Sequence, residues 1–283
     1  MGLLLVGFCI FAYPLFSQYV NYRKQMEQVD EYGAMVSSLP TEEGKRILAA
    51  ATAYNAKLAR TDQNVFSEEK LAVLTAMYQA GEIPAYFLAE KLIGTLEIPK
   101  LDVKLPIYSG TNEHVLQKGI GHLLNSSLPI GGKGTHAVLT GHRGLPSARL
   151  FRDLDRLAIG DFFFVQVLDE PHAYLIDRIE IIEPTDTTHL GIEADEDYIT
   201  LLTCHPYMVN SQRLILRGHR IEYTKQLEAS ARSVKEDYRW ILFLEKYKEY
   251  LIGIGIFLVL LLIMWRRERR NGRKAKETDE KIK

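Results

Sequence analysis

The sequence predicts an all-β core, either a barrel or a sandwich, between two apolar ends. From Gly94 onward, short runs rich in β-branched and aromatic residues alternate with Gly, Pro, Asp and Asn. Closely spaced strands without long intervening helices are typical of all-β domains. The predicted strands cover residues 95–98, 103–108, 135–140, 162–167, 174–182, 198–203 and 214–216.

Length and composition are those of a globular protein with a real core. The chain has 283 residues, of which 47% are hydrophobic. Its formal net charge is -1, and its basic residues form no stripe through the middle of the chain. We therefore expect no nucleic-acid partner.

Residues 1–20 are predicted to be an N-terminal membrane anchor or signal segment. This stretch is almost wholly apolar up to Phe16, although it is shorter than the roughly 20 residues that span a bilayer core. A cleaved secretory signal is the alternative, but a basic n-region and a clear small-residue cleavage site are missing.

Residues 251–265 are predicted to form a C-terminal transmembrane helix, preceded by a juxtamembrane linker over 224–250. The helix is unbroken Leu, Ile, Val, Phe, Gly and Met as far as Trp265, and the tail at 266–283 is rich in Lys and Arg. The positive-inside rule places this basic tail in the cytoplasm. If both ends span the membrane, the middle faces outward. A buried core helix is the alternative reading of 251–265.

Residues 21–91 are predicted to form a helical region ahead of the β core. Thr41 is expected to cap a helix whose apolar residues recur at helical spacing. A second helix is expected over 67–80, with Ser67 as its N-cap and Gly81 at its end.

Cys204 is the single cysteine of the predicted core, since Cys9 lies in the apolar N-terminal stretch. Exposed free thiols oxidise or cross-link, so a lone thiol in an exported domain needs a reason. A nucleophilic cysteine requires a base or cation to favour its thiolate and a donor for the oxyanion. Arg213 begins the next strand, and the chain reversal can bring it beside the thiol. The alternative is that Cys204 is a small buried hydrophobic residue.

His142 is the preferred base, because it follows a predicted strand and stands between Gly141 and Gly144. His205 is nearer to Cys204 in sequence, but successive side chains of a strand point to opposite faces, so it should point away. The remaining histidines have no partner pattern and are expected in the core or in solvent.

No metal site and no cofactor are expected. The Cys and His residues lack zinc-ligand spacing, and His136 with His142 alone does not make a site. The glycine-rich run at 131–134 lacks the Gly-Lys-Ser/Thr ending of a phosphate loop and is expected to be a turn.

These motifs resemble the sortases, and within them the pilus-building class C. The family's cysteine motif, Thr-Leu-x-Thr-Cys, appears at 200–204, and its arginine matches Arg213. The histidine motif of the family matches 140–144, and flanking sequence on both sides is also similar to class C. The resemblance covers roughly 92–223, with three motifs in the right order.

The resemblance implies a closed eight-stranded sortase-type β-barrel over 92–223 that acts as a cysteine transpeptidase at the cell membrane, with its catalytic domain outside. By that resemblance, Cys204 attacks the Thr carbonyl of an LPxTG-like sorting signal, His142 acts as acid and then base, and Arg213 steadies the oxyanion. The implied partners are pilin or surface-protein substrates, with a pilin lysine or a cell-wall precursor as acceptor. Whether thiol and imidazole form an ion pair or a neutral pair stays open.

Two positions depart from the class C pattern. Its members commonly carry an N-terminal lid with an Asp-Pro-aromatic tip, whereas this chain has Asp62 and Phe66 without a proline after the aspartate. Either these two residues form a variant lid, or the lid is absent or loosely held. His205 stands where the family often has a small polar residue, so the loop after the nucleophile is a candidate for tuning substrate choice.

Three rival functions follow from the same residues. A housekeeping-type sortase would attach surface proteins to a cell-wall precursor. A papain-like cysteine hydrolase would need a downstream histidine, whereas His142 precedes Cys204 here. A membrane-tethered adhesin or scaffold would use Cys204 only as a structural residue.

Overall fold

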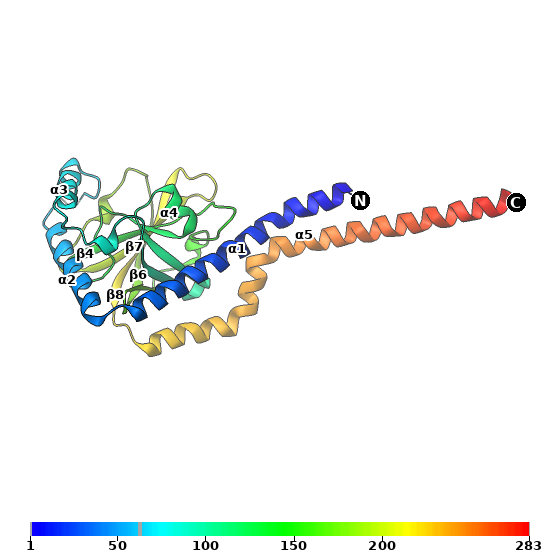
Figure 1. Ribbon diagram of the computed structural model, residues 1–283. Coiled ribbons are helices and arrows are strands. Elements are labelled where there is room, and N and C mark those ends of the chain that lie inside the picture. Colours follow the sequence, from blue (N-terminus) through cyan, green and yellow to red (C-terminus); the bar gives the residue numbers. More distant parts are fainter. Residues whose placement is uncertain (1, 62–63, 283) are drawn as a thin grey trace. The chain divides into compact units, whose positions relative to one another are not determined.

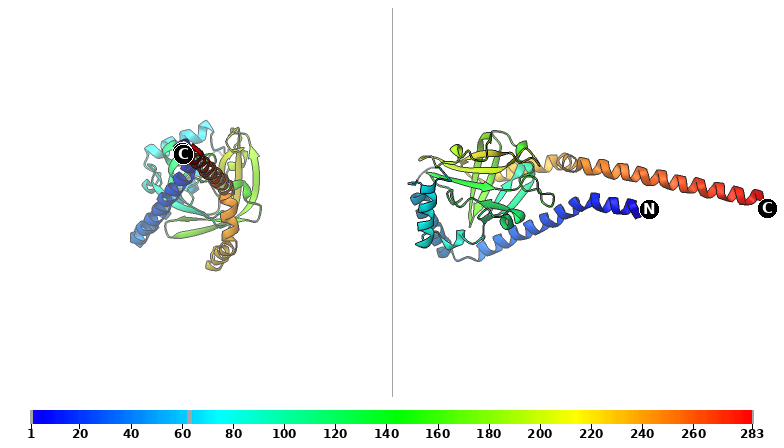
Figure 2. Two further views of the ribbon diagram at one scale, coloured as in Figure 1. Left: turned by 90° about the vertical axis from the view of Figure 1, so that its right-hand side faces the viewer. Right: turned by 90° about the horizontal axis from the view of Figure 1, so that it is seen from above.

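The computed structural model describes residues 2–61 and 64–282 (Figures 1 and 2). The chain forms two compact units. One unit is Tyr13–Ser233 and contains all the strands. The other combines the chain ends, residues 1–12 with 234–283. The helices of the first unit lie around a β-barrel that contains the buried core.

Eight strands form a closed barrel in the order β1-β2-β3-β4-β7-β8-β6-β5, with β1 also paired to β5. This confirms the all-β prediction and the closed eight-stranded barrel implied by the class C resemblance. The strands are β1 Leu92–Ile98, β2 Val103–Ser109, β3 Ile120–His122, β4 Thr135–Thr140, β5 Phe162–Val167, β6 Glu170–Ile182, β7 Asp197–His205 and β8 Gln212–Ile221.

Seven of these strands contain the predicted runs, and β3 was not predicted. β3 has three residues, too few for an alternating pattern to be visible in the sequence. It becomes a strand because it pairs with β2 on one side and β4 on the other.

Two neighbouring pairs in the barrel are parallel, β2 with β3 and β4 with β7. In the second pair, Thr135 lies opposite Asp197 and Thr140 opposite Leu202. Parallel strands end at the same edge of a sheet. The residues that follow β4 and those that finish β7 therefore meet at one edge of the barrel.

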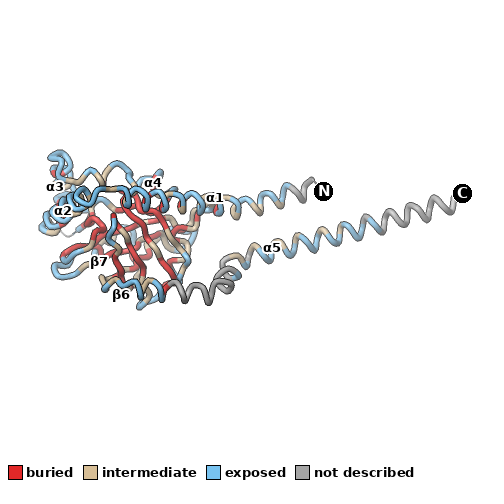
Figure 3. Tube along the Cα trace, turned by 60° about the horizontal axis from the view of Figure 1, so that its bottom comes forward, coloured by how far each residue is buried: buried red, intermediate tan, exposed pale blue. Residues whose placement is uncertain are grey.

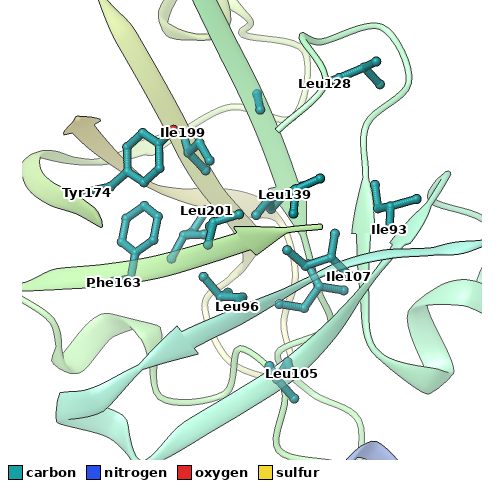
Figure 4. Close-up of a cluster of buried hydrophobic side chains, with 14 of the residues drawn as sticks. Ile93, Leu96, Leu105, Ile107, Leu128, Leu139, Phe163, Tyr174, Ile199 and Leu201 are labelled. Atoms are coloured by element: carbon teal, nitrogen blue, oxygen red, sulfur yellow. The ribbon is translucent and has the colours of Figure 1, made fainter. Parts of the chain in front are cut away.

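Buried residues concentrate on the strands of the barrel (Figure 3), and large apolar side chains from several strands fill its interior (Figure 4). Phe163 stacks on Tyr174 with ring centroids 5.6 Å apart. Gly218 faces this pair, and a Cβ on it would come within 2.7 Å of the Phe163 ring. The close approach of β8 to the two rings therefore requires glycine at this position.

β3 pairs with only part of the edge of β4. The loop that follows β3 covers the rest of that edge. The hydroxyl of Ser126 accepts a hydrogen bond from the Val138 amide, at 2.9 Å, and that of Ser127 accepts from the His136 amide, at 3.0 Å. The Ser127 amide also donates to the His136 carbonyl oxygen. Side chains and loop backbone thus replace a longer neighbouring strand.

Helices connect and flank the strands. They are α1 Gly2–Ser38, α2 Thr41–Leu58, α3 Glu68–Gln79 and α4 Glu113–Lys118, with 3-10 turns η1 Ala85–Phe87, η2 Pro99–Leu101, η3 Leu154–Arg156 and η4 Thr188–Leu190. α1 is anchored by Tyr32, whose buried hydroxyl donates to the Ile93 carbonyl and accepts from the Leu168 amide. α2 is anchored by Asn55, which makes two hydrogen bonds to the backbone of Leu128.

The predicted cap of α2 was one residue off, whereas that of α3 is confirmed. Pro40 is the N-cap of α2, because its carbonyl oxygen accepts from the Glu43 amide and Thr41 is already helical. Ser67 caps α3 by accepting from the Lys70 amide at 3.2 Å. Gly81 follows the helix with φ of 69°, the left-handed conformation that ends many helices.

The second unit contains the first residues of α1 and most of α5, Lys225–Ile282. One stretch among the described residues is long and apolar enough to cross a membrane, Tyr250–Arg267, and it contains the predicted span 251–265. Within this unit Phe8 stacks on Phe257, with centroids 4.7 Å apart.

Candidate active site

His142 and Cys204 come to the same edge of the barrel because β4 and β7 are parallel. Thr140 pairs with Leu202, the last pair in the register. His142 and Cys204 each lie two residues beyond that pair. The fold therefore places His142 and Cys204 at the same edge of the barrel, although they are far apart in the sequence.

Cys204 lies on the outer face of β7 and is half-buried. Leu201 points into the barrel core, so the alternation of side chains places Leu202 and Cys204 on the outer face. Arg213 is the direct cross-strand partner of Cys204 on β8. Directly opposed residues of an antiparallel pair share a face, so the guanidinium group and the thiol lie on the same side of the sheet.

The Arg213 side chain is held by the backbone just before it, at the end of the β7–β8 loop and the start of β8. Its Nη1 donates to the carbonyl oxygens of Gln212, at 2.9 Å, and Asn210, at 3.2 Å. Asn210 has φ of 63°, which turns the chain back toward β8. These bonds limit the rotamers of the guanidinium group while leaving it on the face that carries Cys204.

His142 is placed by tight packing of the loop that follows β4. Its carbonyl oxygen accepts from the Phe151 amide at 3.1 Å, and Gly141 packs on the buried Phe151 ring, where a Cβ would come within 3.1 Å. The Glu113 carboxylate of α4 lies 3.5 Å from His142 Nε2 and makes no hydrogen bond with it. No sequence motif pointed to Glu113.

A side-chain hydrogen bond joins the two chain segments just before the candidate residues. The buried Thr203 hydroxyl donates to the Gly141 carbonyl oxygen at 2.7 Å, and the Gly141 amide donates to Leu202. The threonine of the predicted cysteine motif thus fixes the start of the histidine loop.

The loops after His142 and after Cys204 also contact each other farther out. Gly144 packs against Met208, where an added Cβ would lie 3.3 Å from the sulfur. The Arg152 guanidinium lies over the Tyr207 ring, 5.5 Å from its centroid. The site is therefore walled by two loops that support each other.

The other histidines have structural surroundings, as predicted. His122, His136 and His172 are buried, and burial lowers the pKa of each to about 4. His205 lies on the face opposite Cys204, where its Nδ1 is 2.8 Å from Nη1 of Arg143. Within residues 2–61 and 64–282, the acidic, His and Cys side chains form no group suited to a metal ion.

Of the predicted lid residues, Asp62 lies outside the described residues, and Phe66 is 51% exposed. Between them, Val65 is buried against Val138 of β4 and Leu190, with Leu202 of β7 packed beside them. Leu202 shares the outer face with Cys204. The segment is thus held on the sheet face that leads to the thiol, through a residue that sequence reasoning missed.

Comparison with known proteins identifies the family. Residues 96–221 match the model of the sortase domain. Sortase D of Bacillus subtilis is 33% identical over 131 residues, which cover 45% of this chain and 63% of the relative. The chain thus spans somewhat under two thirds of that curated relative.

Solved structures extend the match beyond the barrel. Sortase C1 of Streptococcus agalactiae is 39% identical with a TM-score of 0.60, covering 71% of this chain and 97% of the solved one. Sortase C of Clostridium perfringens, solved with the C-terminal cell wall sorting motif, is 34% identical with a TM-score of 0.60, covering 70% and 100%.

The chain belongs to the sortase family, whose members are cysteine transpeptidases. Its structural neighbours are pilus-type sortases of class C, as the sequence motifs predicted.

Proposed function

We propose that this protein is a pilus-assembly sortase. It cleaves an LPxTG-like sorting signal between Thr and Gly and transfers the acyl group to a lysine amine of another pilin subunit. The observation that carries this proposal is the meeting of Cys204, His142 and Arg213 at one barrel edge, with Cys204 and Arg213 as direct cross-strand partners. The likeness to class C sortases supports the pilin assignment.

In the first half-reaction, the Cys204 thiolate attacks the Thr carbonyl carbon, and the electron pair of the carbonyl moves to its oxygen. Arg213 stabilises this oxyanion. The tetrahedral adduct collapses to a thioester, the Thr–Gly C–N bond breaks, and His142 as imidazolium donates its proton to the departing amine. The Glu113 carboxylate, 3.5 Å from His142 Nε2, lies beside the imidazole that carries this proton.

In the second half-reaction, a lysine amine attacks the thioester. His142, now neutral, removes a proton from the attacking nitrogen, and the Cys204 thiolate leaves as the isopeptide bond forms. A thioester reacts with amines far better than an oxygen ester does, which suits a cysteine nucleophile to transfer rather than hydrolysis.

The test uses the full-length chain in detergent micelles, a pilin with an LPxTG-like signal and an acceptor pilin. Mass spectrometry should find the truncated pilin on Cys204 and then an isopeptide at an acceptor lysine. Cys204→Ala should abolish both products while the thermal unfolding midpoint stays the same. Polymer formation by Cys204→Ala would refute the enzymatic role, and transfer only to a cell-wall precursor would favour the housekeeping alternative.

We further propose that the segment around Val65 is a variant lid. Its support is the burial of Val65 on the face that carries Leu202 and Cys204. The Val65 carbonyl accepts from Asn125 at 3.0 Å, and Thr187 donates to Asn64 at 2.9 Å, so loops on both sides hold the segment. Asp62 and Phe66 then flank the anchor of the lid rather than form it.

The membrane arrangement is likewise a proposal. The apolar stretch Tyr250–Arg267 anchors the chain, the basic tail stays in the cytoplasm, and the barrel faces outward. A tag at the C-terminus should resist external protease in intact cells, while a tag in the exposed loop at residues 183–185 should be cleaved. Cleavage of the C-terminal tag alone would show the opposite orientation and contradict the proposal.

A further inference from the structure

The residue after His142 is hydrogen-bonded to the residue after Cys204. Nη1 of Arg143 lies 2.8 Å from Nδ1 of His205. A guanidinium group can only donate, so Nδ1 must accept and the ring proton must reside on Nε2. Neutral His205 is therefore the form that completes this contact.

Arg143 is fixed from two further directions. Its Nη2 lies 2.5 Å from the Asp155 carboxylate, and its Nε donates to the Arg152 carbonyl oxygen at 3.2 Å. The side chain is only 5% exposed. A buried guanidinium group held by three partners has little freedom, so it serves as a rigid support.

The Arg143–His205 bond is one of two hydrogen bonds that flank the two reacting side chains. On the preceding side, Thr203 donates to Gly141 at 2.7 Å. On the following side, Arg143 donates to His205. One peptide unit separates each bond from His142 and Cys204, so the two bonds together limit how far the imidazole can move from the thiol.

We propose that Arg143 and His205 are positioning residues that set the separation of His142 and Cys204 for acyl transfer. This rests on the proposed roles of His142 and Cys204. Neither positioning residue touches the reacting atoms. The side chain of His205 acts from the opposite face of β7, which gives a role to a residue that differs from the small polar one often found in class C. Loss of the bond should slow the chemical step and leave peptide affinity unchanged, because a small misplacement of catalytic groups affects kcat.

The test compares kcat and KM of the full-length chain in detergent micelles, with a fluorogenic LPxTG peptide as substrate. His205→Leu removes the acceptor and should lower kcat about tenfold, with KM within about twofold. His205→Asn keeps an acceptor oxygen near the Nδ1 position and should retain kcat within about threefold. The matched control is His189→Leu, which removes a similar Arg–His bond, 2.7 Å between Arg178 and His189, and should leave kcat unchanged.

The positioning role is wrong if His205→Leu keeps the kcat of the wild type, or if His205→Asn or His189→Leu loses as much as His205→Leu. Nitrogen NMR of the unmodified protein gives a second test that does not depend on variants folding, since a proton on Nδ1 of His205 would also refute it. An active Cys204→Ala variant would instead refute the proposed function, so the two failures are distinguishable.

Discussion

The Thr203 hydroxyl donates to the Gly141 carbonyl oxygen at 2.7 Å, which ties the residue before Cys204 to the residue before His142. Thr203 lies in β7 and Gly141 directly follows β4, and these two chain segments lie side by side because β4 and β7 are parallel. The order of strands in the barrel thus becomes a constraint on the site.

Thr203→Val should lower kcat about tenfold and destabilise the barrel by about 1–2 kcal/mol, because valine matches the shape of threonine but leaves the Gly141 carbonyl without its donor. Peptide cleavage and denaturant unfolding measure the two effects. Thr203→Ser keeps the hydroxyl and is the matched control. Equal kcat for the valine variant and the wild type would contradict the role of this bond.

The Arg213→Lys variant should lose almost as much kcat as the Arg213→Ala variant. Lysine keeps the charge, but its ammonium group cannot bond the two backbone carbonyls and face the oxyanion in one fixed plane. Loss of one oxyanion donor costs about a hundredfold or more in kcat. Single-turnover formation of the thioester, followed by mass spectrometry, measures the effect. Near wild-type rates for the lysine variant would assign Arg213 a purely electrostatic role.

Val65→Asp should increase the rate at which iodoacetamide alkylates Cys204 by several-fold. An aspartate cannot remain buried among Val138, Leu190 and Leu202 without a partner, so the segment should leave the sheet face. Phe66→Asp is the neighbouring control, because Phe66 is already 51% exposed, and it should leave the rate unchanged. Equal rates for both variants and the wild type would argue against a lid.

The free energy of unfolding should fall as pH drops from about 6.5 to about 4. Burial lowers the pKa of His122, His136 and His172 to about 4, whereas unfolded histidine titrates near about 6.5. The unfolded chain then binds more protons in this window, so the stabilisation is complete above it and is lost on acidification. Each histidine contributes on the order of 1–3 kcal/mol.

Urea unfolding at several pH values, followed by near-ultraviolet circular dichroism of the barrel tyrosines, measures this slope. His122→Asn should flatten it. His114→Gln is the control, since the His114 side chain is 65% exposed, and should leave the slope as it is. An unchanged slope for His122→Asn would mean that this residue is not the proton-linked group.

The strands and the three candidate residues were predictable because each has a local sequence signal. Alternating apolar runs predicted seven strands, and the motifs around His142, Cys204 and Arg213 singled out residues that the structure places at one edge of the barrel. β3 was not predicted, because its three residues form a strand only by pairing with neighbouring strands. The roles of Arg143 and Val65 were not predicted for a related reason. Their partners lie far along the chain, and His205 is 62 residues from Arg143.

The closed barrel has a consequence for peptide recognition. Many proteins bind an extended peptide by adding it as a strand to a free sheet edge. Here β1 pairs with β5, and Ser126 and Ser127 occupy the edge of β4 that β3 leaves uncovered. Under the proposed function, we therefore expect a sorting peptide to bind through side chains and loops on the outer face, so that its sequence, more than its backbone, determines whether it is accepted.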